Sequence, residues 1–190
     1  MRTAIIFIKI LCLNILMINT AWAADITAES GVHYGGDAIA TVNGTDGSPE
    51  TLRAGEGMSI AGGFGFPLEN NKQFIITFGM KQEVVYFSTG SIRFVRYPLD
   101  ILMIKQRDKW AYGGGLTAHM NPQVKVETET VNQSTDFDNA LGAVFDLRYF
   151  IFPEVFISGR ITWIKYKVSD DPDNASYNGS SIGVLAGIRL

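Results

Sequence analysis

Hydrophobic and polar residues alternate along most of this chain, and the alternation is longest between Arg93 and Asn121. In the first half of the stretch one face is apolar, comprising Val95, Tyr97, Leu99, Ile101 and Met103, and in the second half it continues through Trp110, Tyr112, Leu116, Ala118 and Met120. Alternation with a period of two is typical of half-buried strands. The polar residues Gln106 to Lys109 separate the halves, so the sequence predicts an antiparallel hairpin.

The two faces of this hairpin differ in an unusual way. The apolar face is continuous, whereas the opposite face carries Arg96, Asp100, His119 and several glycines. A soluble barrel would turn its apolar face inward and cover its outside with Lys, Glu and Ser. Here the minority face has the composition of a crowded polar interior, which is the pattern of a transmembrane β-barrel.

The same alternation predicts six further strands, and helical periodicity is absent. The expected strands outside the hairpin are Val32–Val42, Glu56–Phe66, Lys72–Tyr86, Phe137–Phe150, Val155–Val168 and Ser180–Leu190, after a short polar lead at Ala24–Gly31. The predicted fold is therefore all-β, an eight-stranded antiparallel up-and-down transmembrane barrel.

Short and long connections between the predicted strands alternate along the chain. Those after the second, fourth and sixth strands are short, whereas those after the first, fifth and seventh are long and polar, at Asn43–Ala54, Val124–Thr135 and Ser169–Asn178. The connection after the third strand is the exception, being short. Outer-membrane barrels have short periplasmic turns and longer outer loops, so this alternation of connection lengths predicts that both termini are periplasmic.

Residues 1–23 are expected to be a signal peptide. Arg2 supplies a basic start, an apolar segment follows, and Ala21-Trp22-Ala23 matches an A-x-A cleavage site, which leaves residues 24–190 as the barrel domain. The alternative is a membrane anchor, for which the segment is short and interrupted by Lys9. The lone cysteine, Cys12, lies in this segment, so the mature chain would have no disulfide.

Charge and hydropathy add two exclusions. The formal net charge of −3 becomes more negative when Arg2 and Lys9 leave with the signal peptide, and no basic run is present, so we expect no nucleic-acid partner. Beyond the signal peptide no apolar run approaches the ~20 residues that a spanning helix needs.

From Gly31 to Leu190 the chain resembles the small outer-membrane barrels of the OmpA/OmpX type from Gram-negative bacteria. The likeness is carried by three segments: Tyr97-Pro98-Leu99-Asp100, Gly113 to Leu116 with His119 to Pro122, and Leu185 to Leu190. The resemblance implies an outer-membrane location, contact with lipid and lipopolysaccharide, assembly by the barrel insertion machinery and a monomer, but no single activity. Members usually end in an aromatic residue; this chain ends in Leu190, a difference that bears on assembly.

Charged residues recur on the polar face of the predicted strands. The expected lumenal set is Asp37, Lys81, Arg96, Asp100, Asp146, Arg148, Arg160 and Arg189. The interior of an eight-stranded barrel is just wide enough for side chains to fill, and buried charges need partners. We therefore predict a lumenal salt-bridge network, in which Asp100 and Asp146 pair with arginines, and a closed lumen; the alternative is a narrow ion path.

The chain offers little for catalysis. A lipid A-modifying enzyme needs a base beside a nucleophilic Ser or Thr, and neither His33 nor His119 has the adjacent serine of the lipid A deacylases. We expect no catalytic site, no cofactor and no metal, and both histidines hydrogen-bonded in the lumen; Asp170 to Asn174 lacks the Gly and Glu of an EF-hand loop. Two alternatives stay open: a lipid A-modifying enzyme, and a periplasmic soluble barrel that binds a hydrophobic ligand.

Aromatic residues gather at the two ends of the predicted strands. Rings with a polar edge favour the headgroup level of a bilayer, so we interpret these residues as interface girdles rather than ordinary strand packing. The set is Phe66, Phe74, Trp110 and Phe152 near the short turns, with Tyr86, Trp163 and Tyr166 nearer the long loops.

Overall fold

The computed structural model describes residues 24–44, 47–128, 132–169, 171–173 and 175–190, so the expected signal peptide lies outside the described residues. All regular secondary structure in these ranges is β-strand. No helix in the described part of the chain is long and apolar enough to cross a membrane.

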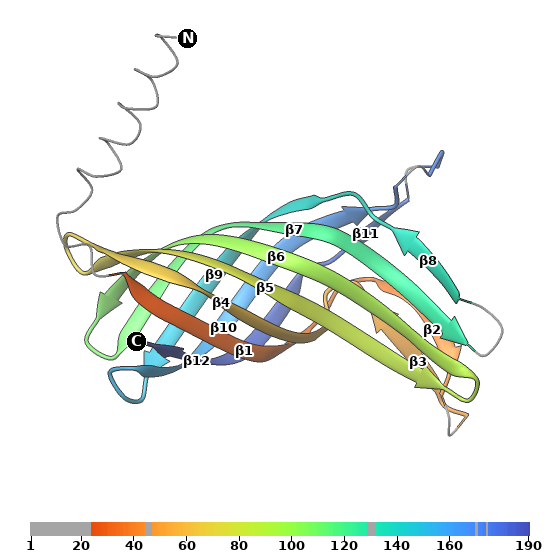
Figure 1. Ribbon diagram of the computed structural model, residues 1–190, viewed down its shortest axis with the longest axis horizontal. Helices are drawn as coiled ribbons and strands as arrows, with labels where there is room; N and C mark the ends of the chain where they lie inside the picture. The colour runs from red at the N-terminus through yellow and green to blue at the C-terminus, as the bar shows by residue number, and fades with distance from the viewer. Residues whose placement is uncertain (1–23, 45–46, 129–131, 170, 174) are drawn as a thin grey trace, which may run out of the picture.

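Eight of the strands found in the described residues close a barrel (Figure 1). They are β1 (Asp25–Tyr34), β4 (Gly57–Leu68), β5 (Lys72–Phe87), β6 (Gly90–Arg107), β7 (Trp110–Thr128), β9 (Ala140–Phe150), β10 (Val155–Lys167) and β12 (Ser181–Arg189). Each pairs antiparallel with the next, and β1 pairs with β12, with Val32 opposite Val184. The predicted eight-stranded antiparallel barrel is therefore confirmed.

Four short strands lie at the end of the barrel away from the C-terminus (Figure 1). β2 (Ala38–Asn43) and β3 (Pro49–Arg53) form a separate hairpin, β8 (Asn132–Asp136) pairs with β7, and β11 (Ser176–Asn178) pairs with β10. The three segments predicted as long loops therefore contain strands that extend the barrel wall or cover its mouth.

The predicted boundaries of the first strand are wrong. The segment expected to be a polar lead forms most of β1, which ends at Tyr34 and does not continue to Val42. Gly35 and Gly36 follow with φ of 130° and 85°, values that side-chain-bearing residues rarely adopt. A Cβ on Gly36 would also lie 2.3 Å from the backbone nitrogen of Gly55. The chain therefore turns across the barrel end at these glycines.

The hairpin of β6 and β7 is as predicted, with a tighter turn of two residues, Asp108 and Lys109. A β-bulge interrupts its register between Val95 and Tyr97, and Asn121 on the facing strand has φ of 44°. A bulge adds a residue to one strand, so the alternation changes phase there. Beyond the bulge Val124 is buried.

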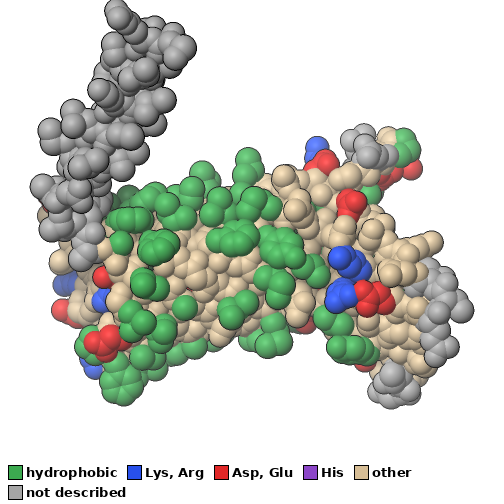
Figure 2. Space-filling view, in the orientation of Figure 1, with side chains coloured by type: hydrophobic (Ala, Val, Ile, Leu, Met, Phe, Trp, Pro, Cys, Tyr) green, Lys and Arg blue, Asp and Glu red, His purple; other side chains and the backbone are tan. Residues whose placement is uncertain are grey.

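Large apolar side chains project outward from all eight barrel strands and form a belt, one face of which is seen in Figure 2. The belt includes Ile60, Phe64, Phe78, Ile101, Leu116, Leu147, Ile157, Ile182 and Val184, which are between 41% and 67% exposed. Figure 2 shows charged side chains at both ends of this belt. We take the belt to define the membrane-facing part of the barrel.

The interior is layered, as the inward residues of β6 show. Ile104 and Leu102 belong to an apolar cluster near the short turns, Asp100 and Arg96 follow, and Phe94 joins a second apolar cluster at the far end. The second cluster, hereafter the upper cluster, includes Leu52 of β3 and Ala54, which follows β3, so the β2–β3 hairpin caps the mouth. Along β6, polar inward residues therefore lie between two apolar layers.

Candidate functional site

The most concentrated chemistry in the structure is a buried ionic layer at the middle of the barrel. Five charged side chains meet there from four strands: Glu29 on β1, Asp100 on β6, Asp146 and Arg148 on β9, and Arg160 on β10. All five are at most 8% exposed at the side chain. Antiparallel pairing of β9 with β10 sets Asp146 directly opposite Arg160.

Arg160 is the centre of this layer. Its Nη2 lies 2.5 Å from Asp146 Oδ2 and 2.7 Å from Glu29 Oε1, and its Nη1 lies 3.2 Å from Asp100 Oδ2. Arg148 adds two contacts, with Nε 3.2 Å from Asp146 Oδ1 and Nη2 3.3 Å from Glu29 Oε2. Burying such charges is tolerable only when they are paired and hydrogen-bonded; here each carboxylate faces at least one guanidinium.

A second polar group lies between the ionic layer and the upper cluster. Its two cations donate to neutral oxygens: Lys81 to Gly55 O at 2.7 Å and to Ser181 Oγ at 3.2 Å, and Arg96 to Glu56 O and to the Tyr166 hydroxyl. Arg96 also stacks over the Phe94 ring, 4.4 Å from its centroid. The guanidinium is therefore held by backbone oxygen, hydroxyl and an aromatic face.

Two members of the predicted lumenal set lie elsewhere. The prediction for Asp37 is wrong: its side chain is exposed between β1 and β2, where its Oδ2 accepts the Asn178 N–H at 2.8 Å. Arg189 lies at the barrel mouth near the termini rather than in the ionic layer, with its Nε 3.9 Å from Asp25 Oδ2. Conversely, Glu29 was missed because most of β1 was interpreted as a lead.

Both histidines are buried and hydrogen-bonded, as expected. His119 Nδ1 lies 2.5 Å from the Tyr166 hydroxyl, and His33 Nε2 lies 2.8 Å from Ser59 Oγ. The His33–Ser59 pair has the distance of a base and a nucleophile, which a search for serines near His33 in sequence could not find. Among the described residues, however, His33 Nδ1 has no hydrogen-bond partner to orient the ring.

The residues predicted to form aromatic girdles lie at both ends of the barrel, and one of them, Tyr166, faces the interior. Phe66 and Phe74 contact each other at 6.3 Å between centroids on adjacent strands, and Trp110 and Phe152 are exposed near the short turns. At the far end Trp163 and Tyr86 are exposed, the latter opposite Ser91 near the β5–β6 turn. Tyr166 is only 1% exposed and faces the interior, so its assignment to a girdle is wrong.

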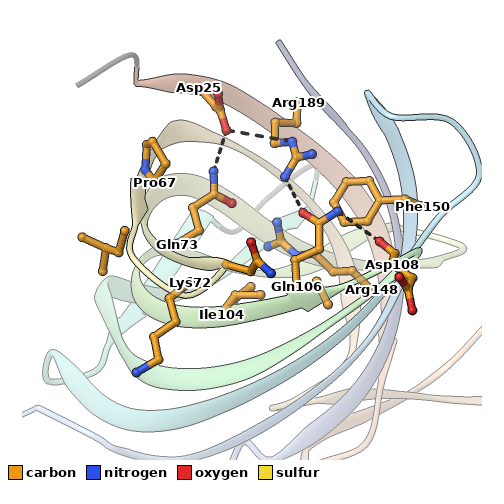
Figure 3. A pocket seen from close by; sticks show the side chains of 13 residues that line it. Asp25, Pro67, Lys72, Gln73, Ile104, Gln106, Asp108, Arg148, Phe150 and Arg189 are labelled. Atoms are coloured by element: carbon orange, nitrogen blue, oxygen red, sulfur yellow. Dashed lines mark hydrogen bonds and ion pairs between the residues drawn. The ribbon is translucent and has the colours of Figure 1, made fainter. Parts of the chain in front are cut away.

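A polar vestibule of about 400 Å³ opens at the barrel end that carries the termini (Figure 3). Arg189 Nη1 donates to Gln106 Oε1 at 3.0 Å, Gln73 Nε2 donates to Asp25 Oδ2 at 2.7 Å, and the Arg189 guanidinium stacks 4.6 Å from the Phe150 ring centroid. These residues partner one another across the mouth. Among the described residues no group of three His, Cys, Asp or Glu could hold a metal ion.

Comparison with known proteins gives matches at the level of structure alone. No family model matches the sequence, and no curated protein matches it. The structure of Ail, the attachment invasion locus protein of Yersinia pestis, in complex with the heparin analogue sucrose octasulfate is 12% identical with a TM-score of 0.59, covering 88% of this chain and 97% of that one. Neisserial surface protein A is 12% identical with a TM-score of 0.52, covering 88% and 96%.

At this level of identity the likeness concerns the fold alone, and it agrees with the closed barrel described above. The resemblance to OmpA/OmpX-type barrels inferred from the sequence is confirmed at that level. The chain therefore has the fold of the small eight-stranded outer-membrane β-barrels.

Proposed function

We propose that this protein is an integral outer-membrane β-barrel with a structural or surface-interaction role. The observation that carries the proposal is the inversion at mid-barrel, where Phe64 and Leu116 are exposed while Asp146 and Arg160 are buried. Soluble monomers rarely expose apolar patches beyond a few hundred Å², and a bilayer removes that cost. In this proposal the belt contacts lipid and lipopolysaccharide. The barrel insertion machinery inserts the protein into the outer membrane, where it acts as a monomer.

The orientation we propose sets both termini in the periplasm. It is supported by the tight turns at the end that carries the termini and by the cap and strand extensions at the other end, the arrangement of outer-membrane barrels. An epitope inserted after Gly47, on the β2–β3 hairpin, should label on intact cells. One inserted after Phe152, in the β9–β10 turn, should label only after permeabilisation; the reverse pattern contradicts the orientation.

The lumen we propose is closed to ions. The support is the sequence of layers along β6, in which the ionic layer lies between two apolar clusters. Planar-bilayer recordings of the purified barrel should give no steady conductance, and a large, steady conductance would contradict this part of the proposal. Fractionation of the cell envelope tests the location itself, since the protein should appear with the outer membrane.

Two other functions compete with this one. The His33–Ser59 distance favours a hydrolase, yet the pair lies inside the barrel wall with His33 buried, away from the lipid that such an enzyme would attack. Mass spectrometry of lipid A from a deletion strain should therefore show no change. A soluble periplasmic barrel for a hydrophobic ligand is opposed by the exposed belt, and heat-modifiable migration on detergent gels, typical of membrane barrels, would exclude it.

The surface partner does not carry over from Ail, whose structure holds a sulfated heparin analogue. At the outer end of this barrel two exposed arginines pair with glutamates, Arg93 with Glu127 and Arg53 with Glu56. A polyanion would have to compete with these carboxylates. We therefore propose a surface role for the cap and extensions without a strongly anionic ligand; retention on immobilised heparin at physiological salt would contradict it.

A further inference from the structure

A basic sector lies on the outside of the barrel at the end that carries the termini. Lys72 of β5 is directly opposite Lys105 of β6, and Arg107 is directly opposite Trp110 of β7. Lys109 follows in the turn, and all four cations are exposed. Like charges directly opposite each other destabilise a strand pair, so an anion bound at this sector would reduce the repulsion.

The acids nearby do not neutralise this sector. Asp108, exposed in the turn between Arg107 and Lys109, lines the vestibule as Lys72 does (Figure 3), and Glu69 and Glu154 lie on the two neighbouring turns. Figure 3 also shows Lys72 directed away from the cluster of Asp25, Arg189 and Gln106. The outward face between β5 and β7 is therefore predominantly positive.

A hollow on the apolar belt begins next to this sector. Its volume is about 390 Å³, and its lining consists of Trp110, Leu147, Tyr149, Ile157, Ser158, Gly159 and Val184. Gly159 forms its floor: it is exposed between Leu147 and Val184 on the paired strands, and among the described residues a Cβ there would meet nothing within 4 Å. The volume falls in the ~300–1,000 Å³ range of small-ligand sites.

Trp110 joins the hollow to the cations. Its ring lies 4.9 Å from that of Tyr149 at the end of the hollow, while its backbone is paired with Arg107. The Lys109 carbonyl accepts the Phe150 N–H at 2.8 Å, which fixes the basic turn beside the end of β9. Tryptophan favours the headgroup level of a bilayer. The cations therefore lie on the headgroup side of Trp110, and the hollow lies on its hydrocarbon side.

We propose that this face binds one anionic phospholipid of the periplasmic leaflet, with its phosphate at Arg107 and Lys109 and one acyl chain in the hollow over Gly159. The proposal rests on the membrane location and orientation proposed above, because that orientation makes the lipid a phospholipid rather than lipopolysaccharide. Juxtamembrane cations attract anionic lipid, and the hollow adds a position for one chain that an evenly covered belt would lack.

Native mass spectrometry of the purified barrel with phosphatidylglycerol or phosphatidylcholine tests the proposal. We expect a one-to-one adduct with phosphatidylglycerol, retained about tenfold better than with phosphatidylcholine, since each surface cation contributes measurably to anionic-lipid binding. Gly159→Leu should fill the hollow and lower retention of both lipids severalfold. Arg107→Gln with Lys109→Gln should remove the preference for phosphatidylglycerol.

Two matched controls separate a site from general lipid contact. Gly62 is also exposed on the belt with room for a side chain, on β4, so Gly62→Leu should leave retention unchanged. Lys165→Gln with Lys167→Gln removes two exposed cations at the other end and should not alter the lipid preference.

Equal retention of the two lipids, equal loss in Gly62→Leu and Gly159→Leu, a protein dimer in place of the adduct, or preference for lipid A over phosphatidylglycerol would each overturn the inference. Heat-modifiable migration of every variant is measured in parallel. A barrel that inserts into vesicles but shows no lipid preference refutes this inference alone, whereas one that does not insert refutes the proposed function.

Discussion

Arg160 joins four strands through a single guanidinium. It extends from β10 and contacts Glu29 on β1, Asp100 on β6 and Asp146 on β9. A planar fork with five donors suits this position better than a lysine would, because it can face several carboxylates at once. The ionic layer therefore links strands across the interior of the barrel and stabilises it, a role hereafter called the cross-brace.

Replacing Arg160 with Met should destabilise the barrel strongly. The three carboxylates would lose their shared cation, and breaking a buried ion pair costs about 3–5 kcal/mol. Urea unfolding in lipid vesicles measures the effect. Arg93→Met is the matched control: the Arg93–Glu127 pair is 37% and 44% exposed, and surface pairs contribute about 0–1 kcal/mol.

If Arg160→Met does not fold, Arg160→Lys decides the question. Lysine keeps the charge but cannot face several carboxylates at once. The Arg160→Lys protein should therefore fold, yet be less stable than both the wild type and Arg93→Met. A lysine variant as stable as wild type would contradict the cross-brace.

At the residue scale, the alternation of inward and outward positions predicted most of the ionic layer, and the errors have specific causes. Asp37 was misplaced because the glycines before it end β1 and change the direction of the chain. Tyr166 has the same inward parity as Ile164 on β10, so the alternation alone places it in the interior, although aromatic side chains favour the membrane interface. The partners of each charge could not be predicted, because they depend on register between distant strands.

The cap hairpin of β2 and β3 is held to the barrel by its apolar underside. Leu52 is fully buried in the upper cluster, which also contains Phe94 of β6 and Phe137. The outer faces of the hairpin are polar, as the Thr41–Thr51 hydroxyl contact at 3.3 Å illustrates. In the cap, therefore, apolar side chains face inward and polar side chains face outward, as in a soluble protein.

Truncating Leu52 to Ala should loosen this cap without opening the barrel wall. Burial of a leucine that leaves a cavity when truncated is worth about 2–5 kcal/mol, and this contribution is local to the upper cluster. Hydrogen exchange at the amides of β2 and β3 should accelerate while exchange at β9 and β10 stays slow. Thr51→Ala, on the same hairpin, should change little; equal acceleration in both variants would contradict the anchor role.

Glu83 contacts the cap, and we expect it to make the attachment of the cap depend on pH. It lies on β5 opposite Phe94, at the level of the upper cluster and the cap, and its carboxylate accepts the Arg53 N–H at 2.9 Å. Burial, reinforced by Glu56, raises the pKa of Glu83 from 4.5 to about 7, although the Arg53 hydrogen bond opposes the shift. A carboxyl with a raised folded pKa binds its proton more tightly in the folded state.

The stability that Glu83 contributes should therefore be complete below about pH 4.5 and lost as the pH rises through about 7. We expect cap exchange rates to increase between these values in the wild type. Glu83→Gln, which cannot ionise, should remove that pH dependence and leave the cap closed at pH 8. A Glu83→Gln protein with the same pH profile as the wild type would show that another group is responsible.

At the element scale, strands with apolar alternation were predicted within a few residues, as β10 and β12 show. β1 was missed in part because its inward residues, Thr27, Glu29 and His33, are polar and its outward ones include Ala28 and Ser30. The strands in the long loops were missed for a different reason. Their pairing depends on the barrel end beneath them, and turn-forming residues dominate their sequence.

Across the whole molecule, the relation between inside and outside reverses along the barrel axis. Within the belt apolar residues face out and ions face in, whereas beyond the bulge at Asn121 Val124 faces in and Lys125 is partly exposed. A single phase shift of one residue accomplishes the reversal on β7. The sequence alone did not reveal it, because an unbroken alternation looks the same on either side of a bulge.

This layering predicts which barrier prevents ion flow. Phe150 belongs to the apolar cluster near the short turns and Phe94 to the upper cluster, so Phe150→Ala and Phe94→Ala each open one end, at a cost of about 3–5 kcal/mol. Neither variant should conduct in planar bilayers, and the double variant should also stay silent, because an ion would still have to displace the packed contacts of Arg160 and Asp146.

The double variant gives the decisive measurement. Its folded state is checked by heat-modifiable migration, and a porin in the same bilayer verifies the recording. Steady conductance in the double variant, with both single variants silent, would mean that the apolar clusters are the barrier and the ionic layer is permeable. If none of the three variants conducts and Arg160→Met is unstable, the five side chains of the ionic layer both close the lumen to ions and stabilise the barrel. Ions paired this tightly leave no carboxylate free to coordinate a passing cation.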